Sequence, residues 1–187
     1  MRIKIINPNT SLEMTKNIDQ AAKSFCNQKT KIITVSPSKG PVSIENFHDQ
    51  ALSVIGIMEE VHKGITENID GFIIAAACDP GLDVAREISK VPVIGIGEAS
   101  MHLASLISKK FSIITVMPRI VPLIELALHN TGLALKCASI RSTDLSVLDT
   151  NKESKQIINK ILLEAHKAVK EDRAEAICLG CSGMTHL

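Results

Sequence analysis

The chain has 187 residues, of which 45% are apolar and 22% charged, a composition typical of a globular protein rather than a disordered, collagenous or coiled-coil chain. Its 21 basic and 20 acidic residues leave a net charge of +1, so electrostatics give no reason to expect nucleic acid or an anionic membrane as a partner. With four Phe and neither Tyr nor Trp, it lacks the aromatic platforms that bind single-stranded nucleic acid. A small-molecule substrate is therefore expected, in one domain or two small lobes.

Short runs of β-branched residues alternate with longer stretches of helical periodicity along the chain. Strands are predicted over residues 2–6, 31–35, 71–77, 91–96, 112–116, 136–140 and 176–179. Helices are predicted over residues 12–25, 49–65, 82–88, 99–107, 122–128 and 154–169. Most of the strands are nearly continuous apolar blocks, which is typical of parallel strands covered on both faces. The predicted fold class is therefore α/β, with doubly wound parallel sheets.

The segment from Asp70 to Cys78 resembles the segment from Ala174 to Cys181, because in both an acidic residue and an apolar strand lead to a cysteine. This echo predicts two similar lobes, residues 1–97 and 98–187. The first lobe continues after its cysteine with a helix and a strand, whereas only six residues follow Cys181. The second lobe is therefore expected to be incomplete at its C-terminus.

The N-terminus has no apolar run long enough for a signal peptide, and no run in the chain reaches the roughly 18 residues of a membrane helix. A cytoplasmic protein is therefore expected. Its five cysteines are an odd number and are expected to be reduced, so that each is a small buried hydrophobe, a metal ligand or a reactive thiol.

Polar loops follow the first two predicted strands, and ligands of open parallel sheets bind where such loops converge. In the first loop, Asn7 and Asn9 offer amides to the crevice, Thr10 and Glu13 have capping-box spacing, and Ser11 is a competing N-cap. The loop is either a donor site for carbonyl oxygens or a well-capped turn. The second loop begins at Ser36 and either closes over a ligand or is only rigid.

Cys78 and Cys181 both stand at the end of a predicted strand. After Cys78, Asp79 is suited to cap a helix and Pro80 to occupy its first turn, which places the thiol at a helix N-terminus where a thiolate is stabilised. Ser182 and Gly183 form a similar turn after Cys181. These two thiols are therefore the candidate reactive groups.

The remaining cysteines favour less specific interpretations. Cys26 and Cys137 are expected to be small buried hydrophobes. Cys178 and Cys181 form a C-x-x-C pair, but Cys178 falls inside a predicted strand and no second ligand pair accompanies it, which argues against a redox or zinc site. The chain also lacks the glycine fingerprints of dinucleotide-binding and P-loop proteins.

Five segments together resemble the hydantoin and allantoin racemases of the aspartate/glutamate racemase superfamily. They are Ile5 to Ser11 with Met14-Thr15, Gly40 to Glu45, Asp79 to Leu82, Val91 to Ser100, and Leu179 to Met184. The resemblance implies two α/β lobes related by a pseudo-twofold axis, a site between them, and cofactor-independent racemisation by two cysteines. It also implies a further strand and helix at the C-terminus, which this chain does not contain.

The position of the first family cysteine depends on the register of the resemblance. Aligned on Asp79 to Leu82, the cysteine falls three positions before the aspartate, at Ala76. Aligned on Ala77 and Cys78, the segment resembles the glutamate racemases instead, and Cys78 is the match. Both positions are expected on one face of the predicted strand, about 7 Å apart.

Inverting a stereocentre next to a carbonyl requires a base on one face and an acid on the other, and two cysteines suit both roles because their pKa lies near neutrality. The predicted catalytic residues are Cys78 and Cys181, with no cofactor and no metal. The predicted substrate-binding residues, chosen from the loops and from the resemblance, are Asn7, Asn9, Thr10, Ser11, Ser36, Pro41, Ile44, Asp79, Glu98, Thr115, Arg119, Ser182 and Gly183.

The predicted substrate is a 5-substituted hydantoin or allantoin. Two alternatives remain: an amino-acid racemase of the Asp/Glu type, and a non-catalytic small-molecule-binding protein or truncated pseudoenzyme. Arg119 and Lys39 are the only evident cations at the site, which slightly favours a neutral cyclic amide over a free amino acid. A homo-oligomer is left open, and neither nucleic acid nor a membrane is expected as a partner.

Overall fold

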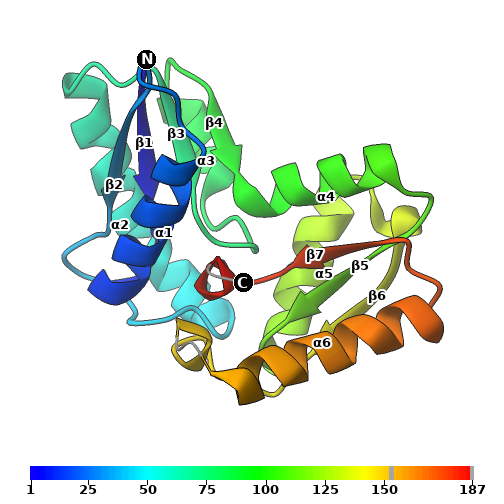
Figure 1. Ribbon diagram of the computed structural model, residues 1–187. Coiled ribbons are helices and arrows are strands. Elements are labelled where there is room, and N and C mark those ends of the chain that lie inside the picture. The colour runs from blue at the N-terminus through cyan, green and yellow to red at the C-terminus, as the bar shows by residue number, and fades with distance from the viewer. Residues whose placement is uncertain (152–153, 186–187) are drawn as a thin grey trace. The chain divides into compact units, whose positions relative to one another are not determined.

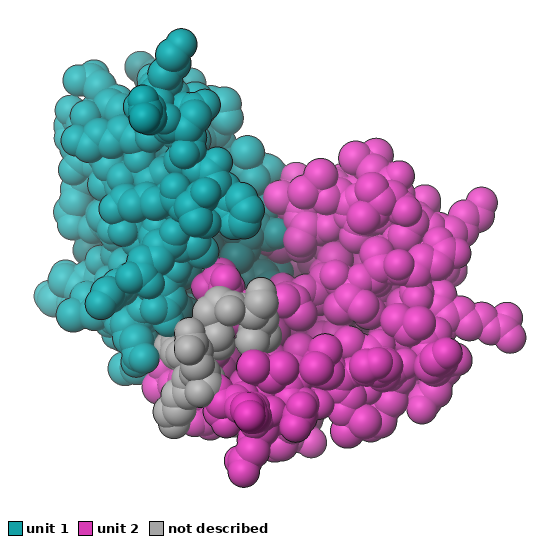
Figure 2. All heavy atoms as spheres, in the orientation of Figure 1, with its two compact units in different colours: residues 1–96 teal, residues 97–187 magenta. Residues whose placement is uncertain are grey.

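The computed structural model describes residues 1–151 and 154–185 (Figure 1). The chain divides into two compact units, Met1–Ile96 and Gly97–Leu187, which are coloured separately in Figure 2. Each unit is built on its own sheet, and every strand pair in both sheets is parallel. This confirms the predicted α/β class with parallel sheets. Among the described residues, no helix combines the length and the apolarity needed to cross a membrane.

Unit 1 contains a four-stranded sheet in the order β2-β1-β3-β4. The strands are β1 (Arg2–Ile6), β2 (Lys31–Val35), β3 (Gly71–Ile74) and β4 (Val93–Gly95). The helices are α1 (Leu12–Ser24), α2 (Phe47–Thr66) and α3 (Leu82–Ile88), and α1 and α2 lie on opposite faces of the sheet (Figure 1). Ile6, Phe72 and Ile74 form the core with Ile57 and Val61 of α2, which explains the apolar character of these strands.

Unit 2 contains a three-stranded sheet in the order β6-β5-β7. The strands are β5 (Phe111–Thr115), β6 (Cys137–Ser142) and β7 (Ala176–Leu179), and the helices are α4 (Ile96–Ile107), α5 (Val121–Asn130) and α6 (Lys155–Lys170). The helix α6 covers one face of the sheet and α5 the other (Figure 1). All five residues of β5 are buried because this strand is central and covered on both faces.

The predicted elements exist, but three boundaries differ in ways that concern the candidate site. The strand β3 ends at Ile74 rather than at residue 77, because the chain turns immediately afterwards. The helix α4 begins at Ile96, directly after β4, rather than at Ala99. The helix α2 begins at Phe47, two residues earlier than predicted, because Asn46 Oδ1 accepts from the Asp49 N–H and caps it.

Candidate functional site

In each unit, the loops that carry the predicted site residues leave the sheet at one edge. Ile6, the last residue of β1, pairs with Val35 of β2 and Ile74 of β3, the last residues of those strands. In unit 2, Thr115 at the end of β5 pairs with Ser142 at the end of β6. The loops after β1, β2 and β3 therefore share one sheet edge, as do those after β5, β6 and β7.

The loop after β1 is organised by Asn7. Its Nδ2 donates to Asn9 Oδ1 at 2.9 Å, to Thr15 Oγ1 at 3.0 Å and to the Ser11 carbonyl oxygen at 3.2 Å. Asn9 Oδ1 also accepts from the Ser11 N–H at 2.9 Å, and both asparagines are buried. The two amides, expected to face the crevice, instead turn toward the loop itself. They shape the loop, because their hydrogen-bonding groups are occupied within it.

Of the two candidate N-caps of α1, the structure uses Ser11, whose Oγ accepts from the Met14 N–H at 3.2 Å. Thr10 instead binds the loop after β2. Its backbone N–H and its hydroxyl both donate to the Pro41 carbonyl oxygen, at 2.9 and 3.3 Å. The loops after β1 and β2 are thus joined through Pro41, while Ser36 is half-buried and Ile44 is buried.

Cys78 lies in a turn, not at the end of a strand as predicted. The Asp79 N–H donates to the Ala76 carbonyl oxygen at 3.0 Å, which closes a β-turn over residues 76–79. Gln50 of α2 donates from Nε2 to the Cys78 carbonyl oxygen at 3.4 Å and holds this turn on α2. The prediction that Ala76 and Cys78 share a strand face is wrong, because the extended conformation has already ended at Ile74.

Asp79 does not cap α3, which corrects a second prediction. The N-cap of α3 is Gly81, which has a φ of 65° and makes no side-chain cap hydrogen bond. The Leu82 N–H donates to the Asp79 carbonyl oxygen at 3.3 Å, with Pro80 and Gly81 in the two central positions of a turn. Pro followed by a left-handed Gly is the pattern of a type II turn. The carboxylate of Asp79 instead packs so closely on Gly95 that a Cβ there would overlap it.

Cys181 is held by contacts of the preceding residue with β5. The Gly180 N–H donates to the Ile114 carbonyl oxygen at 2.7 Å, and the Gly180 carbonyl oxygen accepts from Thr115 Oγ1 at 3.5 Å. Cys181 itself is extended and precedes a single 3₁₀ turn, Ser182–Met184, whose residues are all buried. Thr115, predicted to bind substrate, is fully buried and supports the Cys181 loop through Gly180.

A further residue, Thr150, contacts Cys181 and was not predicted. Its Oγ1 lies 3.6 Å from Cys181 Sγ, and its side chain is completely buried. Thirty-one residues separate the two positions, and Thr150 belongs to no motif or periodic pattern. No signal in a single sequence identifies such a contact.

The other cysteines of unit 2 are set apart from Cys181 by their surroundings. Burial raises the pKa of the Cys178 thiol to about 11, and its Sγ donates to the Ser100 carbonyl oxygen at 3.6 Å. Burial also raises the pKa of Cys137. Cys178 lies within β7, as predicted, and its protonated thiol is unsuited to redox chemistry at neutral pH. Within residues 1–151 and 154–185, no three His, Cys, Asp or Glu side chains gather as a metal site.

The remaining three predicted residues also belong to unit 2. Glu98 is half-buried in the first turn of α4, and Arg119 is exposed in the 3₁₀ turn Pro118–Ile120 after β5. Gly183 is buried in the turn after Cys181.

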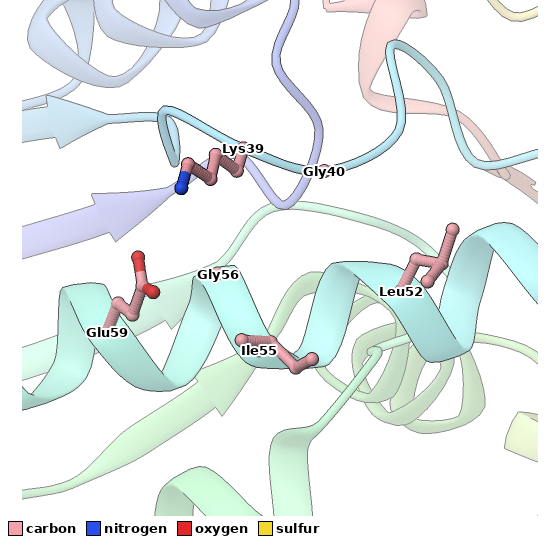
Figure 3. Close-up of a pocket in the computed structure, with 6 residues that line it drawn as sticks. All are labelled: Lys39, Gly40, Leu52, Ile55, Gly56 and Glu59. Atoms are coloured by element: carbon pink, nitrogen blue, oxygen red, sulfur yellow. The ribbon is translucent and has the colours of Figure 1, made fainter.

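A pocket of about 400 Å³ in unit 1 is lined by none of the predicted catalytic or substrate-binding residues. Lys39 and Gly40 of the loop after β2 line one side, and Leu52, Ile55, Gly56 and Glu59 of α2 line the other (Figure 3). The loop approaches α2 closely because Gly56 leaves room for Pro37 and the Lys39 carbonyl group.

The comparisons with known proteins agree over nearly the whole chain. The family model described as Asp/Glu/Hydantoin racemase matches residues 3–187. A hydantoin racemase of Pseudomonas sp. (strain NS671) is 47% identical over 184 residues, which cover 98% of this chain and 74% of that protein.

Two solved structures resemble this one closely. The allantoin racemase from Klebsiella pneumoniae is 40% identical with a TM-score of 0.97, over 100% of this chain and 76% of that chain. The allantoin racemase from Pseudomonas fluorescens is 34% identical with a TM-score of 0.95, over 99% of this chain and 78% of that chain.

Proposed function

Because the chain belongs to the Asp/Glu/hydantoin racemase family, we propose that it racemises a hydantoin at carbon 5, either a 5-substituted hydantoin or allantoin, without a cofactor. The observation that carries this proposal is the 47% identity to a hydantoin racemase across 98% of the chain, supported by the TM-score of 0.97 to an allantoin racemase. Both relatives are named for substrates that contain a hydantoin ring, so the proposed chemistry takes place at that ring.

The chemistry follows from the acidity of the proton at carbon 5, which is adjacent to a ring carbonyl. One thiolate, Cys78 or Cys181, removes this proton and leaves a planar enolate. The other cysteine, as a thiol, delivers its proton to the opposite face of carbon 5. The two sulfurs have then exchanged protonation states, so the same pair operates in the reverse direction for the other enantiomer. No electrons are transferred.

The enolate oxygen needs donors that are already in place. We assign this task to backbone N–H groups of the turn after Cys181, because the backbone N–H groups of Asn7, Asn9, Thr10 and Ser11 already donate to protein oxygens. All three residues of the turn Ser182–Met184 are buried, and the Met184 N–H donates to the Cys181 carbonyl oxygen at 3.0 Å, which holds the turn in one conformation. Rigid donors cost little reorganisation when charge develops on the oxygen. Arg119, exposed after β5, is the proposed cation of the site.

The test is exchange in D₂O of the proton at the stereocentre, which is carbon 5 of a hydantoin and the α-carbon of an amino acid, followed by proton NMR together with optical rotation. Separate samples contain one enantiomer of a 5-substituted hydantoin, allantoin, L-aspartate or L-glutamate, each with a buffer control because hydantoins exchange slowly without enzyme. Exchange with racemisation of a hydantoin is expected. Exchange of the amino acids alone would favour the Asp/Glu-type alternative, and no exchange of any substrate would favour a binding protein without catalysis.

A further inference from the structure

The contact between Thr150 and Cys181 has a chemical consequence beyond packing. A hydroxyl group has one proton and two lone pairs, so it donates to one partner while it accepts from another. Thr150 Oγ1 donates to the Val147 carbonyl oxygen at 2.6 Å. Cys181 Sγ lies 3.6 Å from Thr150 Oγ1. Because the Thr150 hydroxyl proton is engaged in the hydrogen bond to Val147, Thr150 Oγ1 can only accept from Cys181, so the thiol of Cys181 donates to it.

The same hydroxyl also suits the other protonation state of Cys181. When the thiol has lost its proton, rotation about the Cβ–Oγ1 bond allows Thr150 to donate to the thiolate. A hydrogen bond to an ionised acceptor is stronger than one to a neutral acceptor. A group that accepts from the thiol and donates to the thiolate serves a cysteine that alternates between acid and base.

The loop that carries Thr150 is anchored near the end of β5. Thr143 donates from its backbone N–H to the Thr115 and Val116 carbonyl oxygens, at 3.1 and 3.0 Å. Ser146 Oγ donates to Asp149 Oδ2 at 2.6 Å and accepts from the Asp149 N–H at 3.1 Å. The 3₁₀ turn Asp149–Asn151 then packs against the 3₁₀ turn Ser182–Met184 that follows Cys181. These contacts hold Thr150 in one position next to Cys181.

We propose that Thr150 is a positioning residue for Cys181: its buried hydroxyl fixes the sulfur in one orientation and stabilises the thiolate by donating to it. The inference rests on the proposed function for its catalytic meaning, because only a racemase needs Cys181 in both protonation states. Its physical content, the effect of one hydroxyl on one thiol, is measurable without any turnover.

The test measures alkylation of Cys181 by iodoacetamide at pH 7 in the intact protein, quantified for each cysteine by peptide mass spectrometry. Thr150→Val keeps the shape of the side chain and removes the hydroxyl. The rate at Cys181 is expected to fall roughly three- to tenfold, because fewer molecules carry the thiolate. Thr150→Ser keeps the hydroxyl and is expected to stay within about twofold of the parent rate. A merely structural role of the threonine would not produce this rescue.

Thr143→Val is the matched control, because the Thr143 hydroxyl is also buried in this loop but donates to the Thr115 and Val116 carbonyl oxygens. Cys181 should react at the parent rate in that variant. The buried Cys178 reports whether the fold is intact, and its slow labelling should not change.

If Thr150→Val increases the labelling of Cys178, Thr150→Ala removes the same hydroxyl without placing a methyl group in its position, and the same slowing is expected. A parent rate at Cys181 in a folded Thr150→Val or Thr150→Ala variant would overturn the proposal. So would an equal slowing in Thr143→Val. Neither result bears on whether the protein racemises hydantoins, which the deuterium-exchange experiment decides separately.

Discussion

Among individual residues, the proposed first base depends on the geometry of one turn. Ala76 and Cys78 belong to the same β-turn, closed by the Asp79 N–H on the Ala76 carbonyl oxygen, and the register of the family resemblance leaves both positions open. Only residue 78 carries a thiol in this protein. The turn therefore presents its sulfur two residues later than the hydantoin-racemase register implies.

Replacing Cys78 by Ser is expected to lower kcat for racemisation by roughly 10²- to 10⁴-fold, because a proton-transfer group with a suitable pKa is lost. Chiral chromatography of the product measures the rate. Cys137→Ser is the matched control and should retain nearly full activity, because Cys137 lies in the strand β6, is only partly buried, and has a pKa raised by desolvation. Ala76→Cys should change the rate little, because Cys78 already supplies the thiol. A tenfold or greater increase of the racemisation rate in Ala76→Cys would place the base at position 76. An active Cys78→Ser variant would show that the base is a residue other than Cys78.

At the scale of elements, the path of the chain from β7 into the Cys181 turn requires a residue without a side chain. A Cβ on Gly180 would lie 2.9 Å from Ile113 Cγ2 and 3.1 Å from the Ile114 carbonyl oxygen, both on β5. The first neighbour is a branched core side chain and the second is backbone, so neither moves easily.

Gly180→Ala is therefore expected to destabilise the protein by about 1–3 kcal/mol, as overpacked positions do. It should also slow racemisation, since Cys181 follows directly. Urea denaturation gives the first quantity and the deuterium-exchange assay the second. Gly71→Ala in β3 is the comparison variant, because a Cβ there would be 3.6 Å from the Pro92 carbonyl oxygen, an ordinary contact. Equal stability of the two variants would contradict the packing argument.

At the scale of the whole molecule, each unit uses a basic residue of its sheet to hold a covering helix. In unit 1, Lys4 of β1 is buried and pairs with Glu60 and Glu67 at the C-terminal end of α2, at 3.2 and 3.0 Å. In unit 2, Arg141 of β6 forms two hydrogen bonds with Asp172, at 2.6 and 2.9 Å, and a third with Glu171. Arg141 donates from two guanidinium nitrogens to the two carboxylate oxygens of Asp172, a bidentate geometry that lysine cannot reproduce.

The Asp172 carboxylate makes stability depend on pH. Its hydrogen bonds with Arg141 lower its pKa below the usual value, so its contribution is present above the ordinary Asp pKa and is lost as the pH falls through the lowered value. Asp172→Asn is expected to lower stability at pH 7 by about 1 kcal/mol, since the pair is partly exposed. The difference from the parent should shrink below about pH 4.

Calorimetry at pH 7, 5 and 3 checks this dependence. Asp83→Asn serves as the control, because the Asp83 side chain is 92% exposed and lies 4.0 Å from Arg86. That variant should match the parent at every pH. A difference between Asp172→Asn and the parent that does not change with pH would exclude the ion pair as its cause.

The parallel α/β fold was predictable from local patterns alone. Buried parallel strands require nearly continuous apolar runs, and the helices that cover them require an apolar stripe. The sequence also identified the family, but it placed Cys78 at the end of a strand, whereas the strand β3 already ends at Ile74. The expected incompleteness of the second lobe stays a prediction. These results depended on residues that are neighbours in the chain.

The hydrogen-bond partners of the candidate residues, in contrast, were not predictable, because they lie far away in the chain. Thr10 and Ser11 both have side chains that can cap a helix. Ser11 is the N-cap of α1, while Thr10 forms hydrogen bonds with Pro41, thirty-one residues away. Cys181 meets Thr150 for a similar reason, because the loop after β6 returns to the end of β7. Such pairings depend on which loops the strand order brings to one sheet edge, and a local sequence pattern does not encode that order.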